Sequence, residues 1–143
     1  MIEANGLRKA FGAVQAVDGV SFVARDGEIT GLLGPNGAGK TTTLRMLYTL
    51  MQPDAGRVTV DGIDVAADAT AVRRRLGVLP DARGLYKRLT ARENISYFAQ
   101  LQGLDPINAR QRADALIAAL DMADVADRRT EGFSQGQRVK TAI

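Results

Sequence analysis

The sequence predicts an α/β protein whose strands come first and whose second half is helical. Short apolar segments bounded by turn residues fill the first half of the 143 residues, and a glycine-rich loop stands there between an apolar run and a helical pattern. From residue 90 onward, two helical patterns follow each other without an intervening strand. We therefore expect a sheet-based core in residues 1–85 and a helical subdomain in residues 86–143.

Residues 2–24 are expected to form an antiparallel ribbon, because residues 20–24 alternate weakly and a polar turn follows them. Phe11 and Gly12 fall at the tip of the first hairpin. An aromatic ring there could stack on a purine, since its π-face accepts a base without hydrogen bonds. Taken alone, Phe11 is more often a residue that packs the hairpin.

The glycine-rich loop fits the pattern G-x-x-x-x-G-K-[ST] of a phosphate-binding P-loop. Its residues are Gly34, Pro35, Asn36, Gly37, Ala38, Gly39, Lys40 and Thr41. Residues 28–33 before it read as a short buried strand, and residues 42–51 after it have apolar side chains at helical spacing. Strand, loop and helix in this order are the context that the motif requires. The alternative is a glycine-rich turn that happens to precede a helix.

The chemistry expected of this loop follows from its residue types. Glycines let successive backbone N–H groups face one concavity without blocking side chains, and the helix that begins near Lys40 adds the positive end of its dipole. We expect Lys40 to reach the β- and γ-phosphates of a nucleotide and the Thr41 hydroxyl to bind Mg²⁺. Thr42, the next residue, is included among the nucleotide-binding residues.

The chain from residue 52 to residue 80 predicts further short elements. A turn at residues 52–56 precedes a hairpin over residues 57–65, and a short helix is expected around residues 69–75. Residues 76–79 read as a second buried strand, which Pro80 ends. Together these elements predict a parallel sheet with a small antiparallel annex.

A capping box of Thr90 and Glu93 opens the helical half. The helix that it begins is expected to end at Gly103, and a second helix should run from about residue 106 to residue 120. The apolar stripe of the first helix consists of Ile95, Phe98 and Leu101. The residues that the second helix is expected to bury are Ile107, Ala113, Leu116, Ile117 and Leu120.

The last motif of the chain is Gly132-Phe133-Ser134-Gln135-Gly136-Gln137-Arg138. Ser134 and Gln137 form a second capping box, so a loop is expected to enter a helix here, again with N–H groups that suit an anion. Gly136 leaves the backbone open for close approach. The alternative for this motif alone is a plain helix cap.

Composition excludes several chemistries. There is no Cys and no His, which removes disulfides, thiolate metal sites and the usual general base. No apolar run approaches the roughly 20 residues of a membrane span, and no signal-peptide pattern is visible, so the cytoplasm is the expected location. The net charge is +3, and the basic clusters around residues 73–75 and 83–92 fit a solvated helix face better than a nucleic-acid surface.

Taken together, these residues resemble the ATP-binding subunit of ABC transporters over the whole chain. Residues 34–41 match the Walker A motif of that family, and Phe11 stands in the place of its adenine-stacking aromatic residue. Residues 133–137 match the signature motif, usually LSGGQ, with departures at the first and third positions. Residues 84–94 are similar to the branch that includes NatA-type sodium exporters and drug exporters.

The resemblance implies that two such domains pair head to tail, each ATP lying between one P-loop and the partner's signature. Ser134 and Gly136 would then bind the γ-phosphate of an ATP held by a partner's Lys40, with Gln137 in the same motif. ATP binding would drive export through an integral membrane permease subunit, with this chain peripheral on the inner face of the membrane and no nucleic-acid partner. The reaction would be phosphoryl transfer to water.

Two departures from the family pattern change these expectations. Asp81 stands where the family places a Gln that touches Mg²⁺, although a carboxylate can still bind this ion. The Walker B strand, catalytic Glu and switch His of the family do not occur up to Ile143, so the catalytic residues are unknown. We expect an N-terminal fragment of an ABC ATPase that hydrolyses ATP negligibly by itself. The alternatives are a non-catalytic ATP-binding module, or a soluble ABC protein that acts on ribosomes or DNA.

Overall fold

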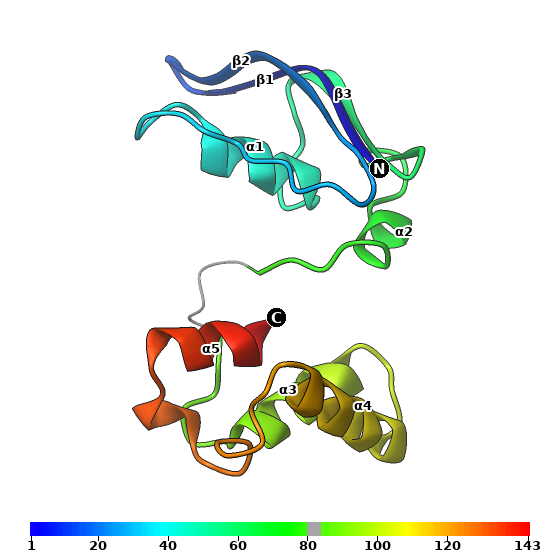
Figure 1. The fold of residues 1–143 in the computed structure, drawn as a ribbon. Coiled ribbons are helices and arrows are strands. Elements are labelled where there is room, and N and C mark those ends of the chain that lie inside the picture. The colour runs from blue at the N-terminus through cyan, green and yellow to red at the C-terminus, as the bar shows by residue number, and fades with distance from the viewer. Residues whose placement is uncertain (80–83) are drawn as a thin grey trace. The chain divides into compact units, whose positions relative to one another are not determined.

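A computed structural model gives the structure of the chain and describes residues 1–79 and 84–143 (Figure 1). Two compact units make up the described chain, Met1–Gly77 and Val78–Ile143. Each unit has an apolar core of its own. Asp81, the expected Mg²⁺ ligand, lies outside the described residues.

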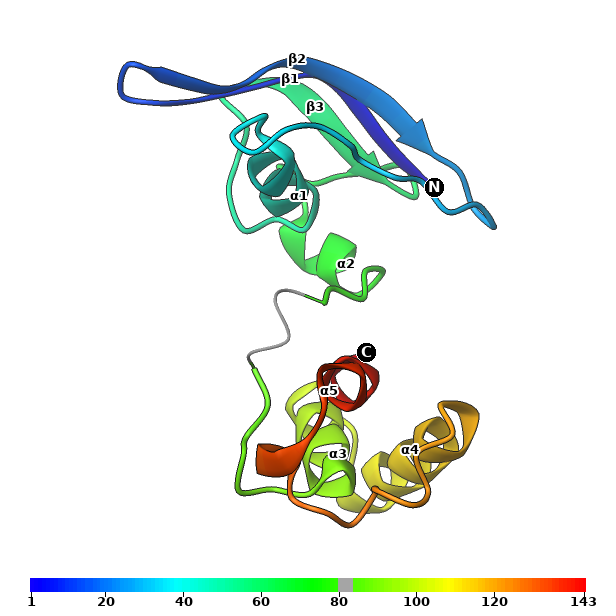
Figure 2. The same cartoon turned by 60° about the vertical axis from the view of Figure 1, so that its left-hand side comes forward.

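The first unit is built on a four-stranded antiparallel sheet with the strand order β2-β1-β3-β4. Strands β2, β1 and β3 of this sheet are labelled in Figure 2. The strands are β1 (Ile2–Phe11), β2 (Val14–Ala24), β3 (Ala55–Val60) and β4 (Ile63–Asp64). The ribbon predicted for residues 2–24 is confirmed, and Phe11 pairs with Val14 at its tip. The predicted second hairpin is also present, formed by β3 and β4.

Helix α1 (Lys40–Leu47) packs against the sheet, and α2 (Ala69–Arg73) follows β4 (Figure 2). The predicted apolar positions of the first helix are only partly correct. Met46 and Leu47 are buried in the core, whereas Leu44 and Leu50 are exposed. The helix ends at Leu47, so Leu50 lies beyond it and cannot share its buried face.

Two predicted strands are not formed. Residues 28–33 and 76–79 belong to no strand, and the side chains of Ile29 and Leu33 are almost fully exposed. An extended segment becomes a strand only when neighbouring strands accept and donate its backbone hydrogen bonds. In residues 1–79 and 84–143 the sheet consists of β1–β4 alone, and none of these strands pairs with either segment. The predicted parallel sheet is therefore absent from the described chain, while the antiparallel annex is present.

The second unit consists of helices α3 (Ala91–Leu101), α4 (Pro106–Ala119) and α5 (Gln135–Ala142), with a short 3₁₀ turn at Thr130–Gly132. Both predicted capping boxes are confirmed, at the starts of α3 and α5. The buried residues of its core are Ala91, Ile117, Met122, Val125, Ala126 and Phe133. None of the helices that the structure describes is long and apolar enough to cross a membrane.

The predicted burial of Ile107 is wrong, since this side chain is 72% exposed. The buried positions of α4 are Ala109, Ala113 and Ile117, which recur every four residues along one face. Ile107 lies two residues before Ala109, and two residues turn a helix through roughly 200°, to the opposite face. The stripe of α3 is likewise less buried than predicted, because Phe98 and Leu101 are largely exposed.

Gly56 brings strands β1 and β3 unusually close. It has φ +85°, and a Cβ atom at this position would lie 2.4 Å from the carbonyl oxygen of Gly6. Gly62 has a similar φ of +77°, but no atom lies within 4 Å of its Cβ position. The two glycines therefore separate the cost of a left-handed backbone from the cost of a steric clash.

We predict that Gly62→Ala lowers the free energy of unfolding by about 1–2 kcal/mol, the usual cost of a left-handed backbone for an L-residue. Gly56→Ala should cost at least about 3 kcal/mol, because β1 and β3 must also move apart. Hydrogen exchange of the Ala4 and Val58 amides, whose residues pair across β1 and β3, measures the effect. Equal losses in the two variants would contradict the close approach at Gly56.

Candidate nucleotide-binding site

The backbone of the P-loop is shaped by glycines. Gly37 and Gly39 have φ values of +85° and +80°, which an L-residue rarely adopts. Gly39 also lies against strand β2, since a Cβ atom there would come within 2.2 Å of the carbonyl oxygen of Ala16. The N–H of Ala38 donates to the carbonyl of Pro35 at 3.2 Å and closes the loop. Gly39 is thus required both for its conformation and for its position on the sheet.

The side chain of Lys40 folds back onto the loop that precedes it. Its Nζ atom donates to the carbonyl oxygens of Gly34 and Pro35, each at 2.6 Å. These two hydrogen bonds hold the ammonium group beside the start of α1. A positive charge is therefore fixed at the place where the loop backbone turns into the helix.

Backbone donors gather at the same place. Five backbone N–H groups at the end of the loop and in the first turn of α1 have no hydrogen-bond acceptor within residues 1–79 and 84–143. They belong to Gly37, Gly39, Lys40, Thr41 and Thr42. The first N–H groups of a helix are free for a ligand and carry the positive end of the helix dipole. Together with the Lys40 ammonium, this donor set fits a polyphosphate such as that of ATP.

The other helices of the chain begin differently. Side chains accept backbone N–H groups at the starts of α2, α3, α4 and α5, and the capping residues are Asp68, Thr90, Asp105 and Ser134. Gly39, at the start of α1, has no side chain to do so. Among the α-helices that the structure describes, α1 therefore differs in keeping its N-terminal donors free of a side-chain cap.

The predicted magnesium ligands are only partly described. Thr41 lies exposed in the first turn of α1, where its hydroxyl can face a bound phosphate group, whereas Asp81 is outside the described residues. Within those residues no group of three or more acidic side chains could hold a metal ion alone. A cation here would need phosphate oxygens as additional ligands, which is usual for Mg²⁺ at nucleotide sites.

Phe11 lies in the same unit as the P-loop, at the end of β1. It is 50% exposed, and the Nζ atom of Lys9 lies 5.9 Å from the centroid of its ring. The P-loop and this hairpin are joined through β2, because Gly39 packs on the carbonyl of Ala16, two residues beyond Val14, the partner of Phe11. The structure thus brings the predicted base platform and the phosphate loop together in one unit.

The signature residues belong to the second unit. Ser134 caps α5, with its Oγ accepting the N–H of Gln137 at 3.2 Å and the Gln137 side-chain oxygen accepting the N–H of Ser134 at 3.0 Å. Gly136 follows in the first turn, and no atom lies within 4 Å of its Cβ position. Phe133 is 3% exposed and anchors the motif in the core. An apolar residue at the first signature position is therefore needed for packing, and Phe133 meets this need.

A buried asparagine supports this motif and is missing from the residues predicted from the sequence. Asn94 in α3 is fully buried; its Oδ1 accepts the N–H of Tyr86 at 2.9 Å, and its Nδ2 donates to the carbonyls of Tyr86 at 3.2 Å and Thr90 at 2.9 Å. Thr130 extends the network, with its N–H donating to Leu89 at 3.0 Å and its hydroxyl to the carbonyl of Tyr86 at 3.1 Å. Asn94 thus fixes the segment before α3 and, through it, the turn that leads into the signature.

Arg92 makes a second connection within this unit. Its Nε donates to Asp127 at 2.8 Å, and its guanidinium also pairs with Asp114 in α4. The hydrogen bond from Arg92 lowers the pKa of the Asp127 carboxyl. The backbone N–H of Arg92 donates to Ala126 at 3.0 Å, so α3 is joined to the segment after α4 by both main chain and side chain.

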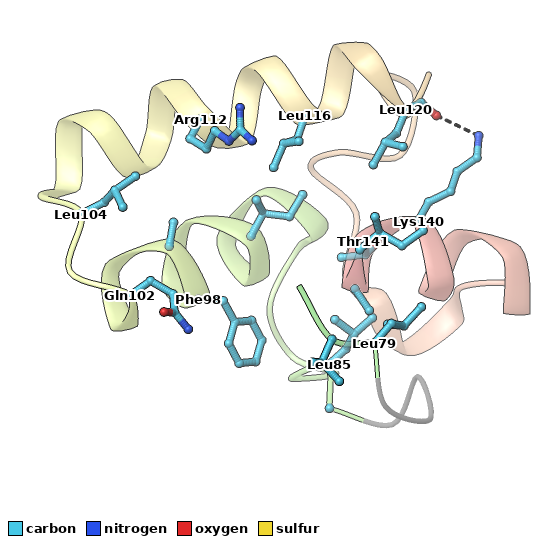
Figure 3. Close-up of a pocket in the computed structure, with 16 residues that line it drawn as sticks. Leu79, Leu85, Phe98, Gln102, Leu104, Arg112, Leu116, Leu120, Lys140 and Thr141 are labelled. Carbon is cyan, nitrogen blue, oxygen red and sulfur yellow. Dashed lines mark hydrogen bonds between the residues drawn. The ribbon is translucent and has the colours of Figure 1, made fainter. Parts of the chain in front are cut away.

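A large cavity in the second unit is not a phosphate site. It has a volume of about 580 Å³, and leucines and Phe98 form much of its wall (Figure 3). Lys140 at its edge donates to the carbonyl of Leu120 at 2.8 Å and thereby ties α5 to the end of α4. The lining of this cavity is mostly apolar, which does not suit a polyphosphate, so we do not assign it to the nucleotide.

Comparison with known proteins identifies the class. The family described as ABC transporter matches residues 17–143, and the chain belongs to this family. It is 46% identical over 131 residues to the ABC transporter ATP-binding protein NatA of Bacillus subtilis (strain 168), covering 91% of this chain and 53% of that protein. The similarity to the ABC ATP-binding subunits and to their NatA-type branch is thereby confirmed.

Two further proteins support this class. The daunorubicin/doxorubicin resistance ATP-binding protein DrrA of Streptomyces peucetius is 42% identical over 142 residues, with coverage of 99% of this chain and 43% of that protein. The dimeric post-hydrolysis structure of the ATP-binding cassette MJ0796 with ADP and Pi superposes with a TM-score of 0.79 at 25% identity, covering 99% and 68%. The fold class predicted from the sequence is confirmed. The chain spans about half the length of the curated relatives it matches.

We predict that Asn94→Leu lowers the free energy of unfolding of the second unit by about 3 kcal/mol, because the N–H of Tyr86 loses its acceptor and the carbonyls of Tyr86 and Thr90 each lose one of their donors. Gln100→Leu makes the same amide-to-leucine change at an exposed position of α3 and should cost less than about 0.5 kcal/mol. Urea denaturation followed by helix circular dichroism measures both. If the two variants unfold at the same urea concentration, the Asn94 network does not stabilise the unit.

Proposed function

We propose that this chain is the ATP-binding part of an ABC transporter subunit that hydrolyses ATP to drive export across a membrane. The observation that carries the proposal is the set of unpaired N–H groups around the Lys40 ammonium at the start of α1. Such a set is chemically matched to the oxygens of a triphosphate. Membership of the ABC transporter family and the similarity to a drug-resistance ATP-binding protein support ATP as the ligand and export as the process.

Within this proposal each residue of the site has a defined role. Residues 34–39 and the N–H groups of Thr41 and Thr42 surround the phosphates, and Lys40 leaves its loop carbonyls to contact the β- and γ-phosphates. The hydroxyl of Thr41 is a ligand of Mg²⁺, which supplies charge neutralisation of the phosphates when it is bound, and Asp81 is a further candidate ligand. Phe11 stacks on the adenine.

The second nucleotide contact comes from another copy or a related subunit. We propose that Ser134, Gly136 and Gln137 present the N-terminus of α5 to the γ-phosphate held by a partner's P-loop. The dimeric form of the MJ0796 structure supports pairing with a second ATP-binding domain. An integral membrane permease subunit is the proposed third component, which places the protein on the inner face of the membrane. We assign no catalytic carboxylate to a residue of this chain.

The proposed role of Lys40 in phosphate binding is tested by the variant Lys40→Ala. We expect this variant to bind Mg-ATP at least about tenfold more weakly, because hydrogen bonds to a charged group contribute about 1.5–3 kcal/mol. Lys87→Ala, which removes an exposed lysine of the second unit, is the matched control and should leave affinity unchanged. Isothermal titration of the 143-residue chain measures both. Equal affinity of Lys40→Ala and the unmodified chain would refute the proposed site.

Hydrolysis is a separate prediction. Because no carboxylate of this chain is assigned to orient the attacking water, we expect the 143-residue chain to release phosphate from Mg-ATP at a negligible rate. A full-length relative assayed at the same concentration serves as the positive control. Turnover comparable to that relative, and abolished by Lys40→Ala, would show that the chain contains the catalytic group.

A further inference from the structure

Asp54 holds the end of strand β1 at three points. Its backbone N–H donates to the carbonyl of Arg8 at 2.9 Å, and its Oδ2 accepts the N–H of Ala10 at 2.8 Å. Its Oδ1 accepts from the Nζ atom of Lys9 at 2.6 Å. Three consecutive residues directly before Phe11 are therefore fixed by one residue.

On the side of β3, the sheet does not provide this support. The pairing of β1 with β3 ends at Arg8 and Ala55, and the pairing of β1 with β2 is irregular between Lys9 and Ala10. An irregular strand end is free to bend unless other groups take its backbone donors. The carboxylate of Asp54 takes the N–H of Ala10 at the point where the ladder with β3 has stopped.

Lys9 connects the Asp54 carboxylate to the aromatic ring of Phe11. The ammonium group contacts the Asp54 carboxylate and lies 5.9 Å from the centroid of Phe11, within the range of a cation–π interaction. The Lys9 side chain is only 18% exposed, whereas Phe11 is 50% exposed. One part of the ring is thus covered by a fixed cation, and the exposed part remains available for a planar ligand.

We infer that Asp54 is a positioning residue which, together with Lys9, holds the Phe11 ring as a platform for the purine of the bound nucleotide. The inference rests on the proposed function and adds a residue that the sequence motifs do not contain. Asp54 lies in the segment between α1 and β3, so it also joins the platform to the helix that carries Lys40. The hydrogen bond from Lys9, and next that from Ala10, lower the pKa of the Asp54 carboxyl and keep it ionised at neutral pH.

The platform and the phosphate loop supply separable contributions to affinity. Stacking on an aromatic ring depends on the base, whereas the P-loop contacts only phosphate. Tripolyphosphate, which has no base, should therefore bind through the P-loop and Lys40 without a contribution from Phe11. ATP should bind more tightly than tripolyphosphate by the contribution of the ring.

The experiment compares the affinities of the 143-residue chain for Mg-ATP and Mg-tripolyphosphate. Asp54→Asn keeps the size of the side chain but weakens its bonds to Lys9 and Ala10, and we expect it to weaken ATP binding about five- to tenfold, a fraction of what losing the whole ring costs. Tripolyphosphate binding should change less than twofold. Asp18→Asn is the matched control, because Asp18 lies on the same hairpin but pairs with Arg8, whereas Asp54 pairs with Lys9.

Phe11→Ala completes the test. It should weaken ATP binding at least as much as Asp54→Asn, and the double variant should bind no more weakly than Phe11→Ala, since Asp54 acts through the ring. Unchanged tripolyphosphate binding shows in each variant that the P-loop is still folded. Parallel loss of both ligands in Asp54→Asn, or full additivity in the double variant, overturns the positioning role.

Failure of the proposed function gives a different result. If the unmodified chain binds neither ligand, or binds tripolyphosphate independently of Lys40, the P-loop assignment fails and the inference fails with it. If Lys40-dependent tripolyphosphate binding is present but ATP binds no more tightly, only the platform at Phe11 is refuted.

Discussion

Where α1 begins, the backbone of Gly39 passes so close to strand β2 that a Cβ atom would lie 2.2 Å from the carbonyl oxygen of Ala16. This close approach fixes the first turn of the helix, with its unpaired N–H groups and the Lys40 ammonium, to the most extensive strand pair of the unit. The same strand pair ends in Phe11. One backbone contact therefore sets the spacing between the groups that suit phosphate and the ring that suits a base.

The helix N-termini at the two predicted phosphate contacts differ in whether a side chain caps them. At α1 a glycine without a side chain leaves the N–H groups free, while at α5 the Ser134–Gln137 capping box satisfies two of the groups internally. A capped N-terminus is more stable by itself, and an uncapped one gains stability only when an anion binds. The difference suits a primary phosphate site at α1 and a preformed second contact at α5, whose position depends on buried Phe133 and the Asn94 network.

Local sequence patterns predict the features that depend on neighbouring residues. They do not predict features that depend on hydrogen bonds to residues far away in the sequence. The capping box of Thr90 and Glu93 needs four consecutive residues, and the hairpin at Phe11 needs one turn, so both could be predicted. Residues 28–33 do not form the predicted strand, because apolar composition does not supply the adjacent strand that pairing requires. The role of Asn94 is not predicted from the sequence, because its hydrogen-bond partners are backbone groups of a loop. Its position directly after the capping box is a sequence feature that could have indicated a structural role. Asp54 lies in a segment that the sequence predicts as a turn, and nothing in that turn pattern indicates that Lys9, 45 residues earlier, is its partner.

The P-loop donors and the Phe11 ring differ in which part of a nucleotide they can recognise. Backbone N–H groups and an ammonium attract any polyphosphate, so the start of α1 provides affinity but does not recognise a nucleoside. An aromatic ring recognises a base only if its plane is held, because a freely rotating ring loses entropy when a ligand stacks on it. The Lys9–Asp54 pair restricts the ring before the ligand arrives and therefore lowers this entropic cost. Under this proposal, recognition of the nucleoside depends on the Asp54 carboxylate, which need not touch the nucleotide.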